Sequence, residues 1–370
     1  MTLPLLRLTG TPYAQGFAHG QTLRAEIARN LDIYFERFER EAKLAPAEAL
    51  DRARRYAVAL AGSAPDYHAG MCGIADGSDQ SLDRIAALNV RYEILYYQFG
   101  RNALAVRDPD GCTAFAVAPV ASASGHLLIG ENWDWIPEVR GAILHTTDTD
   151  GFRSLGFTEA GIFGAKIGLN EVGLGLVING MTTTTDDWSR LSLPFHARCH
   201  AILRARSLAA AIEIVEAAPR ACAANFLLAQ TPDLIADVEA APDRTQRWAA
   251  EEGRLYHTNH FLDPHALGVI EPKIERAPDS QDRLDRVRLL LETGRPLAFT
   301  DLAAALRDEA GLPDAICRQP DLTQPPEERY ATVVSIIMDL HDRTLWVTDG
   351  PPKGREYEAV ALAGEFATVG

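Results

Sequence analysis

A cysteine that directly follows a glycine opens an apolar run in this sequence. The segment DPDGCTAFAV, residues 109–118, contains the pair Gly111 and Cys112. Glycine adopts backbone angles closed to other residues, so the Cys112 thiol could attack the carbonyl that precedes it. Water would open the resulting thioester and leave Cys112 as a new N-terminus. Its α-amine, with a pKa of about 7.7–8.0, could then serve as the base for its own thiol. The alternative is an inert buried thiol, the usual state of a free cysteine.

Three further polar residues stand where they could assist such a cysteine. In GENWDW, Asp134 ends a predicted strand close to the start of its hairpin partner at Cys112. In YHTNHF, Asn259 could donate its side-chain amide to a tetrahedral oxyanion. In AICRQP, Arg318 could bind a substrate carboxylate or hold a catalytic aspartate. The plainer alternatives are a turn-capping aspartate, a loop asparagine and a surface cation.

Two other classes of function stay open at this point. His257, His260 and His265 suggest a zinc hydrolase, because HxxH spacing can bind the metal, although no HExxH motif accompanies them. In such an enzyme Cys112 would be dispensable. The other class is a non-enzymatic binding protein, whose sign would be an uncleaved chain with an occluded Cys112.

Composition excludes several kinds of protein. The chain has 370 residues, 47% hydrophobic and 24% charged, which is typical of a globular protein. Its formal net charge of -15 argues against binding to nucleic acid, because phosphates need a basic surface. Five scattered cysteines without a CxxC motif predict neither a disulfide framework nor a thiolate zinc site. They are Cys72, Cys112, Cys199, Cys222 and Cys317.

The sequence predicts a cytoplasmic protein that does not bind a membrane. Its N-terminal segment lacks the basic region and cleavage site of a secretory signal. No run approaches the roughly 18 apolar residues of a spanning helix. We expect no cofactor and no bound metal, and no motif indicates an oligomeric state.

Hydrophobic periodicity predicts a helical first third followed by mostly antiparallel sheet with helices packed on it. This pattern indicates a layered α+β sandwich whose strands are covered on both faces. Helices are predicted over residues 14–60, with a second stretch at 46–62, and over 81–99, 194–218, 280–293 and 299–309. Strands are predicted in CTAFAVAPV, HLLIGENWDW, GIFGAKIGL, GLGLVING, residues 224–230 and 233–239, ATVVSIIMDL and TLWVTDG.

Several of these segments, in this order, resemble the acyl-coenzyme A:6-aminopenicillanic acid acyltransferase family, also called peptidase family C45. They are DGCTAF, GENWDW, TEAGIFGAKIGLNEVGLGL, YHTNHF, AICRQP and VVSIIMDLHDRTLWVTDGPP. The resemblance spans most of the chain, from GTPYAQGFAHG to GPPKGREYE. It implies the N-terminal nucleophile hydrolase fold, an α+β four-layer αββα sandwich with antiparallel sheets. It also implies one autoprocessed domain over residues 1–370, cut between Gly111 and Cys112.

The same resemblance implies roles for particular residues. The cut would give a mainly helical fragment, 1–111, and a second fragment, 112–370, which stay together. Cys112 corresponds to the nucleophile, Asp134 to the active-site aspartate, Asn259 to the oxyanion donor and Arg318 to the active-site arginine. The expected reaction passes through an acyl-enzyme on Cys112, which water releases in an amidohydrolase and an amine releases in an acyltransferase.

The expected substrate is a small N-acyl or aminoacyl amide, and the alternative is acyl-CoA-dependent N-acylation of the penicillin type. The hairpin segment APVASASGHLLIG is a few residues longer than in the fungal penicillin enzyme, and the frequent peroxisomal-type ending of the family is missing. Three arginines could contact an acidic substrate, but we expect each to be a solvated helix residue. They are Arg198, Arg283 and Arg286.

Overall fold

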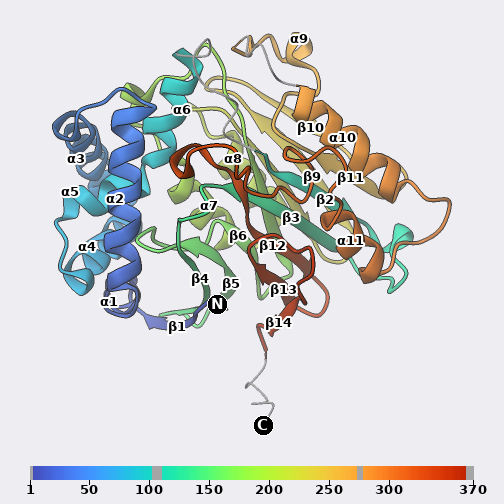
Figure 1. Cartoon of the computed structure of the whole chain (residues 1–370). Coiled ribbons are helices and arrows are strands. Elements are labelled where there is room, and N and C mark those ends of the chain that lie inside the picture. Colours follow the sequence, from blue (N-terminus) through green and yellow to red (C-terminus); the bar gives the residue numbers. More distant parts are fainter. Residues whose placement is uncertain (1–2, 102–110, 273–277, 364–370) are drawn as a thin grey trace.

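Two β-sheets pack face to face in the centre of the molecule, and helices cover both outer faces (Figure 1). The computed structural model describes residues 3–101, 111–272 and 278–363. The predicted four-layer αββα sandwich of the α+β class is confirmed. Most of the turn that precedes Gly111, residues 102–110, lies outside the described residues.

The larger sheet contains, within the described residues, eight strands in the order β1-β4-β5-β6-β7-β8-β9-β10. β1 runs parallel to β4 and every other pair is antiparallel, so the predicted antiparallel sheets have one exception. The strands are β1 (Leu5–Gly10), β4 (Gly141–Asp148), β5 (Arg153–Glu159), β6 (Ile167–Asn170), β7 (Leu174–Gly180), β8 (Ala224–Gln230), β9 (Leu234–Ala240) and β10 (Thr245–Trp248).

The smaller sheet is antiparallel and, over the same described residues, has six strands in the order β11-β2-β3-β12-β13-β14. Both hairpins predicted here, β2 with β3 and β12 with β13, are confirmed. The strands are β2 (Thr113–Val117), β3 (Leu128–Trp135), β11 (Arg254–His257), β12 (Ala331–Asp339), β13 (Thr344–Asp349) and β14 (Glu358–Ala361).

Helices form an outer layer on each sheet (Figure 1). α7 (Phe195–Leu203) and α8 (Leu208–Glu216) lie on the larger sheet, whereas α10 (Pro278–Leu291) and α11 (Phe299–Leu306) cover the smaller one. The remaining α-helices are α1 (Pro12–Thr22), α2 (Arg24–Arg40), α3 (Pro46–Ser63), α4 (Pro65–Ser78), α5 (Leu82–Asn89), α6 (Arg91–Arg101) and α9 (Pro264–Leu267). Short 3-10 turns occupy Pro119–Ala121, Trp188–Arg190 and Pro326–Glu328.

The predicted helices are correct in type, but three of the predicted stretches are divided. The stretch over 14–60 is divided after α1 and again after α2, the stretch over 81–99 between α5 and α6, and the stretch over 194–218 between α7 and α8. Ser207 starts α8 by accepting a hydrogen bond from the backbone of Ala210. Ser81 starts α5 by accepting one from the backbone of Arg84.

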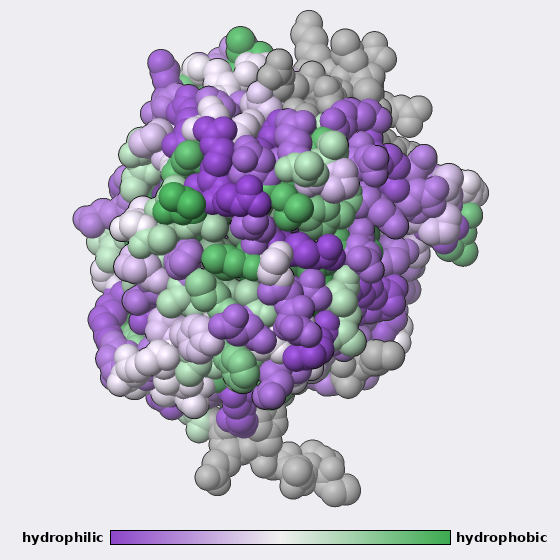
Figure 2. Space-filling view, turned by 90° about the vertical axis from the view of Figure 1, so that its left-hand side faces the viewer, coloured by the Kyte–Doolittle hydropathy of each residue, from purple (hydrophilic) through white to green (hydrophobic). Residues whose placement is uncertain are grey.

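The N-terminal helices bury one face and expose the other. In α2, Ile27, Leu31, Tyr34 and Phe38 are fully buried at three- and four-residue spacing. Phe17 in α1 is partly exposed instead. Figure 2 shows the side of the molecule that carries these helices, with hydrophobic residues scattered among hydrophilic ones. None of the helices in the described part of the chain has the length and apolar character needed to cross a bilayer.

Candidate active site

Cys112 lies in the interior at the start of β2, and its main chain is held from two layers. Its side chain is buried, and its sulfur is 3.9 Å from the backbone oxygen of Asp134. Its carbonyl oxygen accepts hydrogen bonds from Nδ2 of Asn179 on β7 at 3.3 Å and from Nη1 of Arg283 on α10 at 2.6 Å. The carbonyl of Cys112 is therefore fixed independently of the bond to Gly111.

Gly111 leaves no room for a side chain at the predicted cleavage site. A Cβ atom at this position would lie 2.7 Å from Cζ and Nε of Arg318 and 2.7 Å from Oδ2 of Asp134. Real Cβ atoms essentially never approach other atoms this closely. The fold therefore brings Gly111, Cys112, Asp134 and Arg318 together.

Asp134 is anchored on both carboxylate oxygens. Thr332, which faces it on β12, donates its hydroxyl to Oδ1 at 2.7 Å. Nε of Arg318 is 3.5 Å from Oδ2, and Nη2 of Arg318 is 2.8 Å from Asp279 and 3.3 Å from Asp314. All of these contacts are with the protein itself. Of the two roles considered for Arg318, the geometry agrees with holding Asp134.

The side-chain amide of Asn259 donates one N–H to the carbonyl of Gly180 at 3.1 Å, which leaves its second N–H for another acceptor. Its side-chain oxygen accepts a hydrogen bond from Nη2 of Arg283 at 3.1 Å, and its backbone N–H donates to Ser280 at 2.8 Å. Arg283 therefore connects Asn259 to the carbonyl of Cys112. The predicted oxyanion donor is close to the site, and one of its two N–H groups is held by another acceptor.

The expectation of solvated arginines was wrong for two of the three. Arg283 is 2% exposed and contacts Cys112, and Arg198 is 3% exposed and donates to the carbonyl of Ile214. Both lie on helix faces that are turned towards the sheets. Arg286 is partly exposed and pairs with Asp308 at 2.7 Å.

The three histidines of the zinc hypothesis do not converge on one point. His257 contacts Glu239 through Nε2 at 3.0 Å, His260 contacts Ser280 through Nδ1 at 2.8 Å, and His265 is exposed on α9. The zinc hypothesis for these three histidines is therefore wrong, because their ring nitrogens contact different partners. In the described part of the chain, one group is close enough to share a metal ion: His126, Asp339 and Asp342.

A narrow cavity of about 10 Å³, room for roughly one water molecule, lies beside Cys112. Its walls are largely aromatic. The ring of Tyr92 stacks on Tyr96 at 3.8 Å and on Phe195 at 4.1 Å between ring centres. The other aromatic and charged lining residues are Trp133, Trp135, Arg91 and Lys166. The lining suits a small group with apolar surface, but the walls must move apart to admit one.

A buried charged cluster borders this cavity, and none of its members was predicted from the sequence. Nζ of Lys166 is 2.7 Å from Oε1 of Glu159, and Nε of Arg91 is 3.2 and 3.1 Å from the two oxygens of the same carboxylate. Burial lowers the pKa of Lys166 to about 8 although Glu159 opposes this shift. Burial alone would raise the pKa of Glu159, but Arg91 and Lys166 hold it well below its usual range. A lone lysine inside the apolar run GIFGAKIGL was the available signal.

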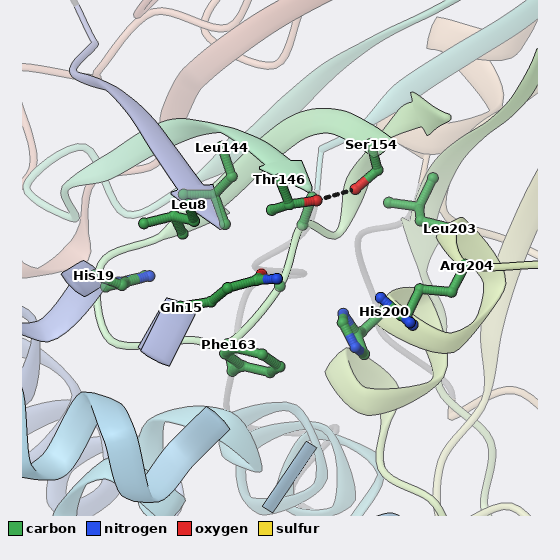
Figure 3. Close-up of a pocket in the computed structure, with 12 residues that line it drawn as sticks. Leu8, Gln15, His19, Leu144, Thr146, Ser154, Phe163, His200, Leu203 and Arg204 are labelled. Carbon is green, nitrogen blue, oxygen red and sulfur yellow. Dashed lines mark hydrogen bonds between the residues drawn. The ribbon is translucent and has the colours of Figure 1, made fainter. Parts of the chain in front are cut away.

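A second cavity lies apart from Cys112, among α1, β4, β5 and α7 (Figure 3). Figure 3 shows the hydrogen bond of 2.7 Å between the hydroxyl groups of Thr146 and Ser154 at its edge. Phe163, Gly164 and Ala165 line this second cavity, whereas the next residue, Lys166, lines the cavity beside Cys112. The loop before β6 therefore separates the two cavities. Of the predicted site residues, Cys112 lines the first cavity and none lines the second.

Comparison with known proteins places these features in a wider group. The family model described as acyl-coenzyme A:6-aminopenicillanic acid acyl-transferase matches residues 120–353. The 40 kDa form of the acyl-coenzyme A:6-aminopenicillanic-acid-acyltransferase of Emericella nidulans is 28% identical over 353 residues, which cover 93% of this chain and 91% of the relative.

Solved structures with a similar arrangement are more distant. A variant of the conjugated bile acid hydrolase of Clostridium perfringens has a TM-score of 0.49 and 12% identity, over 69% of this chain and 94% of that one. The penicillin V acylase of Agrobacterium tumefaciens has a TM-score of 0.44 and 13% identity, over 67% of this chain and 84% of that one.

Proposed function

The chain belongs to the acyl-coenzyme A:6-aminopenicillanic acid acyl-transferase family, whose members are enzymes of acyl transfer and amide hydrolysis, and we propose that it acts through Cys112 after cutting its own backbone. The observation that carries the proposal is the packing of the Gly111–Cys112 bond against Asp134 and Arg318 in the interior. A buried bond of this kind is reached by groups of the chain itself.

Self-cleavage begins with attack of the Cys112 sulfur on the carbonyl carbon of Gly111. The thiol proton passes to the amide nitrogen of Cys112 as the C–N bond breaks, which gives a thioester and a free α-amine. Water then attacks the thioester, forming the carboxylate of Gly111 and restoring the thiol. In this proposal Arg318 and Thr332 hold Asp134 in position beside the reacting bond.

In the mature enzyme the Cys112 sulfur attacks the carbonyl of an acyl substrate, and the α-amine takes up the thiol proton and passes it to the leaving group. The side-chain amide of Asn259 binds the oxyanion through the N–H that does not donate to the carbonyl of Gly180. Water or an amine then removes the acyl group from sulfur. Hydrolysis and acyl transfer share this acyl-enzyme, so the acceptor decides between them.

The aromatic lining beside Cys112 favours a small N-acyl or aminoacyl amide as the substrate, and the cavity must widen to admit it. The acyl-CoA-dependent transfer named for the Emericella relative is the second candidate, because that protein matches over nearly the whole chain. Parallel assays with N-acyl amides and with acyl-CoA thioesters plus an amine would separate the two activities.

Intact mass spectrometry under denaturing conditions tests the proposal directly. We expect wild-type protein to give fragments of 111 and 259 residues, and Cys112→Ala to give a single full-length chain without acyl-transfer or amidase activity. Cys72→Ala, which changes a half-buried thiol on α4, is the matched control and should be cut normally. A wild-type chain that stays whole, or a Cys112→Ala chain that is cut, would contradict self-cleavage by this cysteine.

A further inference from the structure

Two cations share one carboxylate in the cluster next to the Cys112 cavity. Arg91 and Lys166 both contact Glu159, and the side chains of all three are at most 3% exposed. A buried charge is unfavourable unless an opposite charge or hydrogen bonds compensate it. Because Glu159 supplies a single negative charge to two cations, the cluster favours a further anion in its surroundings.

Two neighbouring ionisable groups, His196 and Cys199, do not supply this anion to Lys166. His196 stands 3.9 Å from Glu159, and burial holds its pKa well below the usual range, so it is neutral. Burial raises the pKa of Cys199, which keeps that thiol protonated. Glu131 accepts the backbone N–H of Ile178 at 2.9 Å, and Glu93, whose pKa burial raises to about 7, accepts that of Phe195 at 2.6 Å.

Cys112 is the group placed to supply it. Thr113 pairs with Asn132, so the next pair along the antiparallel ladder is Cys112 and Trp133, which share one face of the sheet. Nζ of Lys166 lies 3.0 Å from the centre of the Trp133 ring, and both Cys112 and Lys166 line the same cavity. The electrostatic interaction between Cys112 and Lys166 raises the pKa of the lysine, and by reciprocity it favours the ionised sulfur.

We propose that Lys166 stabilises the Cys112 sulfur as a thiolate in the uncleaved chain and thereby promotes attack on Gly111. The inference rests on the proposed self-cleavage and names the group that activates the thiol for that step. Before cleavage the nitrogen of Cys112 belongs to an amide and cannot act as the base. A buried ammonium offsets this absence by lowering the free energy of the thiolate. The thiol proton then reaches the leaving nitrogen by way of water, which takes it up as the thiolate forms and returns it as the C–N bond breaks. Lys166 is thus a positioning residue that acts through Cys112 in the first step of self-cleavage.

The test follows freshly translated chains between pH 6 and pH 9, with and without iodoacetamide. Mass spectrometry measures the rate at which fragments appear and the rate at which the Cys112 peptide is alkylated. We expect Lys166→Met to raise the pKa of the Cys112 thiol. At pH 7, each pH unit of that rise should slow both rates about tenfold. Near pH 9, where the thiol ionises without help, both rates should return to those of the wild type. Lys353→Met, which removes an exposed lysine paired with Glu309, is the control and should follow the wild type.

Two results would overturn the role of Lys166. One is a Lys166→Met chain with wild-type rates, and the other is an equal loss at every pH, which would indicate a structural defect. Lys166→Gln keeps a donor for Glu159 without the charge and replaces the methionine variant if that variant does not fold. A wild-type chain that is never cut would refute the proposed function alone, because alkylation of Cys112 would still report the effect of Lys166.

Discussion

At the scale of single residues, two buried carboxyl groups, those of Asp186 and Glu93, hold protons more tightly than they would in water. Asp186 is fully enclosed, and burial raises its pKa to about 7, although its hydrogen bonds from Thr183 at 2.6 Å and from the backbone of Ala223 at 3.2 Å act in the opposite direction. Glu93 has a pKa raised to about 7 for the same reason. Such groups make the stability of the fold depend on pH.

Asp186 gives the sharpest prediction of this kind. Its folded pKa lies above the usual value of about 3.9, so its contribution to stability is complete below pH 4 and is lost as the pH rises through 7. We expect the free energy of unfolding to fall between pH 4 and pH 8. Asp186→Asn should make the free energy of unfolding decrease less over this pH range. The part of the decrease that it removes is about 1.4 kcal/mol for each pH unit between the folded and the unfolded pKa of Asp186. Urea unfolding in an uncut Cys112→Ala background measures it. Asp233→Asn, an exposed change, is the control, and equal slopes for all chains would contradict the prediction.

At the scale of elements, α1 and α4 touch through glycine. A Cβ at Gly73 would come within 3.0 Å of the carbonyl oxygen of Tyr13, and one at Gly16 would do the same at the carbonyl oxygen of Gly70. Neither glycine has a positive φ, so the close approach of the two backbones explains why glycine occupies both positions. The packing sets how the N-terminal helices rest on the larger sheet.

A methyl group at this contact should force the helices apart. We expect Gly73→Ala to lower the free energy of unfolding by about 1–3 kcal/mol through overpacking. Gly62→Ala is the matched control, because Gly62 is exposed on α3 and a Cβ there meets nothing within 4 Å. It should be neutral or stabilising by up to about 1 kcal/mol. Equal midpoints in thermal unfolding for the two variants would contradict close packing of α1 on α4.

Element by element, the sequence predicted β2, β3, β6, β7, β8, β9, β12 and β13, and missed β1, β4, β5, β10, β11 and β14. β2, β7, β8 and β12 are apolar runs and were predicted. β4 and β5 contain buried polar residues such as His145, Thr158 and Glu159, whose partners come from distant segments and leave no local pattern. Arg283 was missed for the same reason, since a charged helix residue gives no sign that a carbonyl of another element will pair with it.

The site was predictable where short motifs carry it and not where the fold assembles it. Asp134 follows from its place at the end of a hairpin strand, and Arg318 from its motif. The orientation of Asn259 depends on Gly180, and the environment of Cys112 depends on Lys166, two contacts between the sheets that no spacing in the sequence encodes.

At the scale of the whole molecule, the two predicted fragments interlock. β1, which belongs to residues 1–111, forms the edge of the larger sheet beside β4 of the second fragment (Figure 1). Asn30 on α2 donates to the carbonyls of Arg140 at 2.8 Å and Ala160 at 3.0 Å. One core cluster includes buried residues on both sides of the predicted cut. The fragments therefore share a sheet and a core.

Cleavage should leave the assembly intact. We expect the fragments of 111 and 259 residues to co-elute in size-exclusion chromatography in native buffer and to separate only in denaturant. The shared core and the β1–β4 pairing are the physical reason. The uncut Cys112→Ala chain provides the reference elution volume. Release of the smaller fragment in native buffer would show that the shared sheet and core do not hold the two pieces together.

The close packing around Gly111 links self-cleavage to folding. The groups that surround it, Asp134 on β3 and Arg318 in the segment before β12, come together only when the smaller sheet has formed. A nascent or misfolded chain lacks this arrangement and would keep its backbone whole. The ratio of cut to uncut chains would then serve as an internal record of how many molecules reached the native state, readable on a denaturing gel without a substrate.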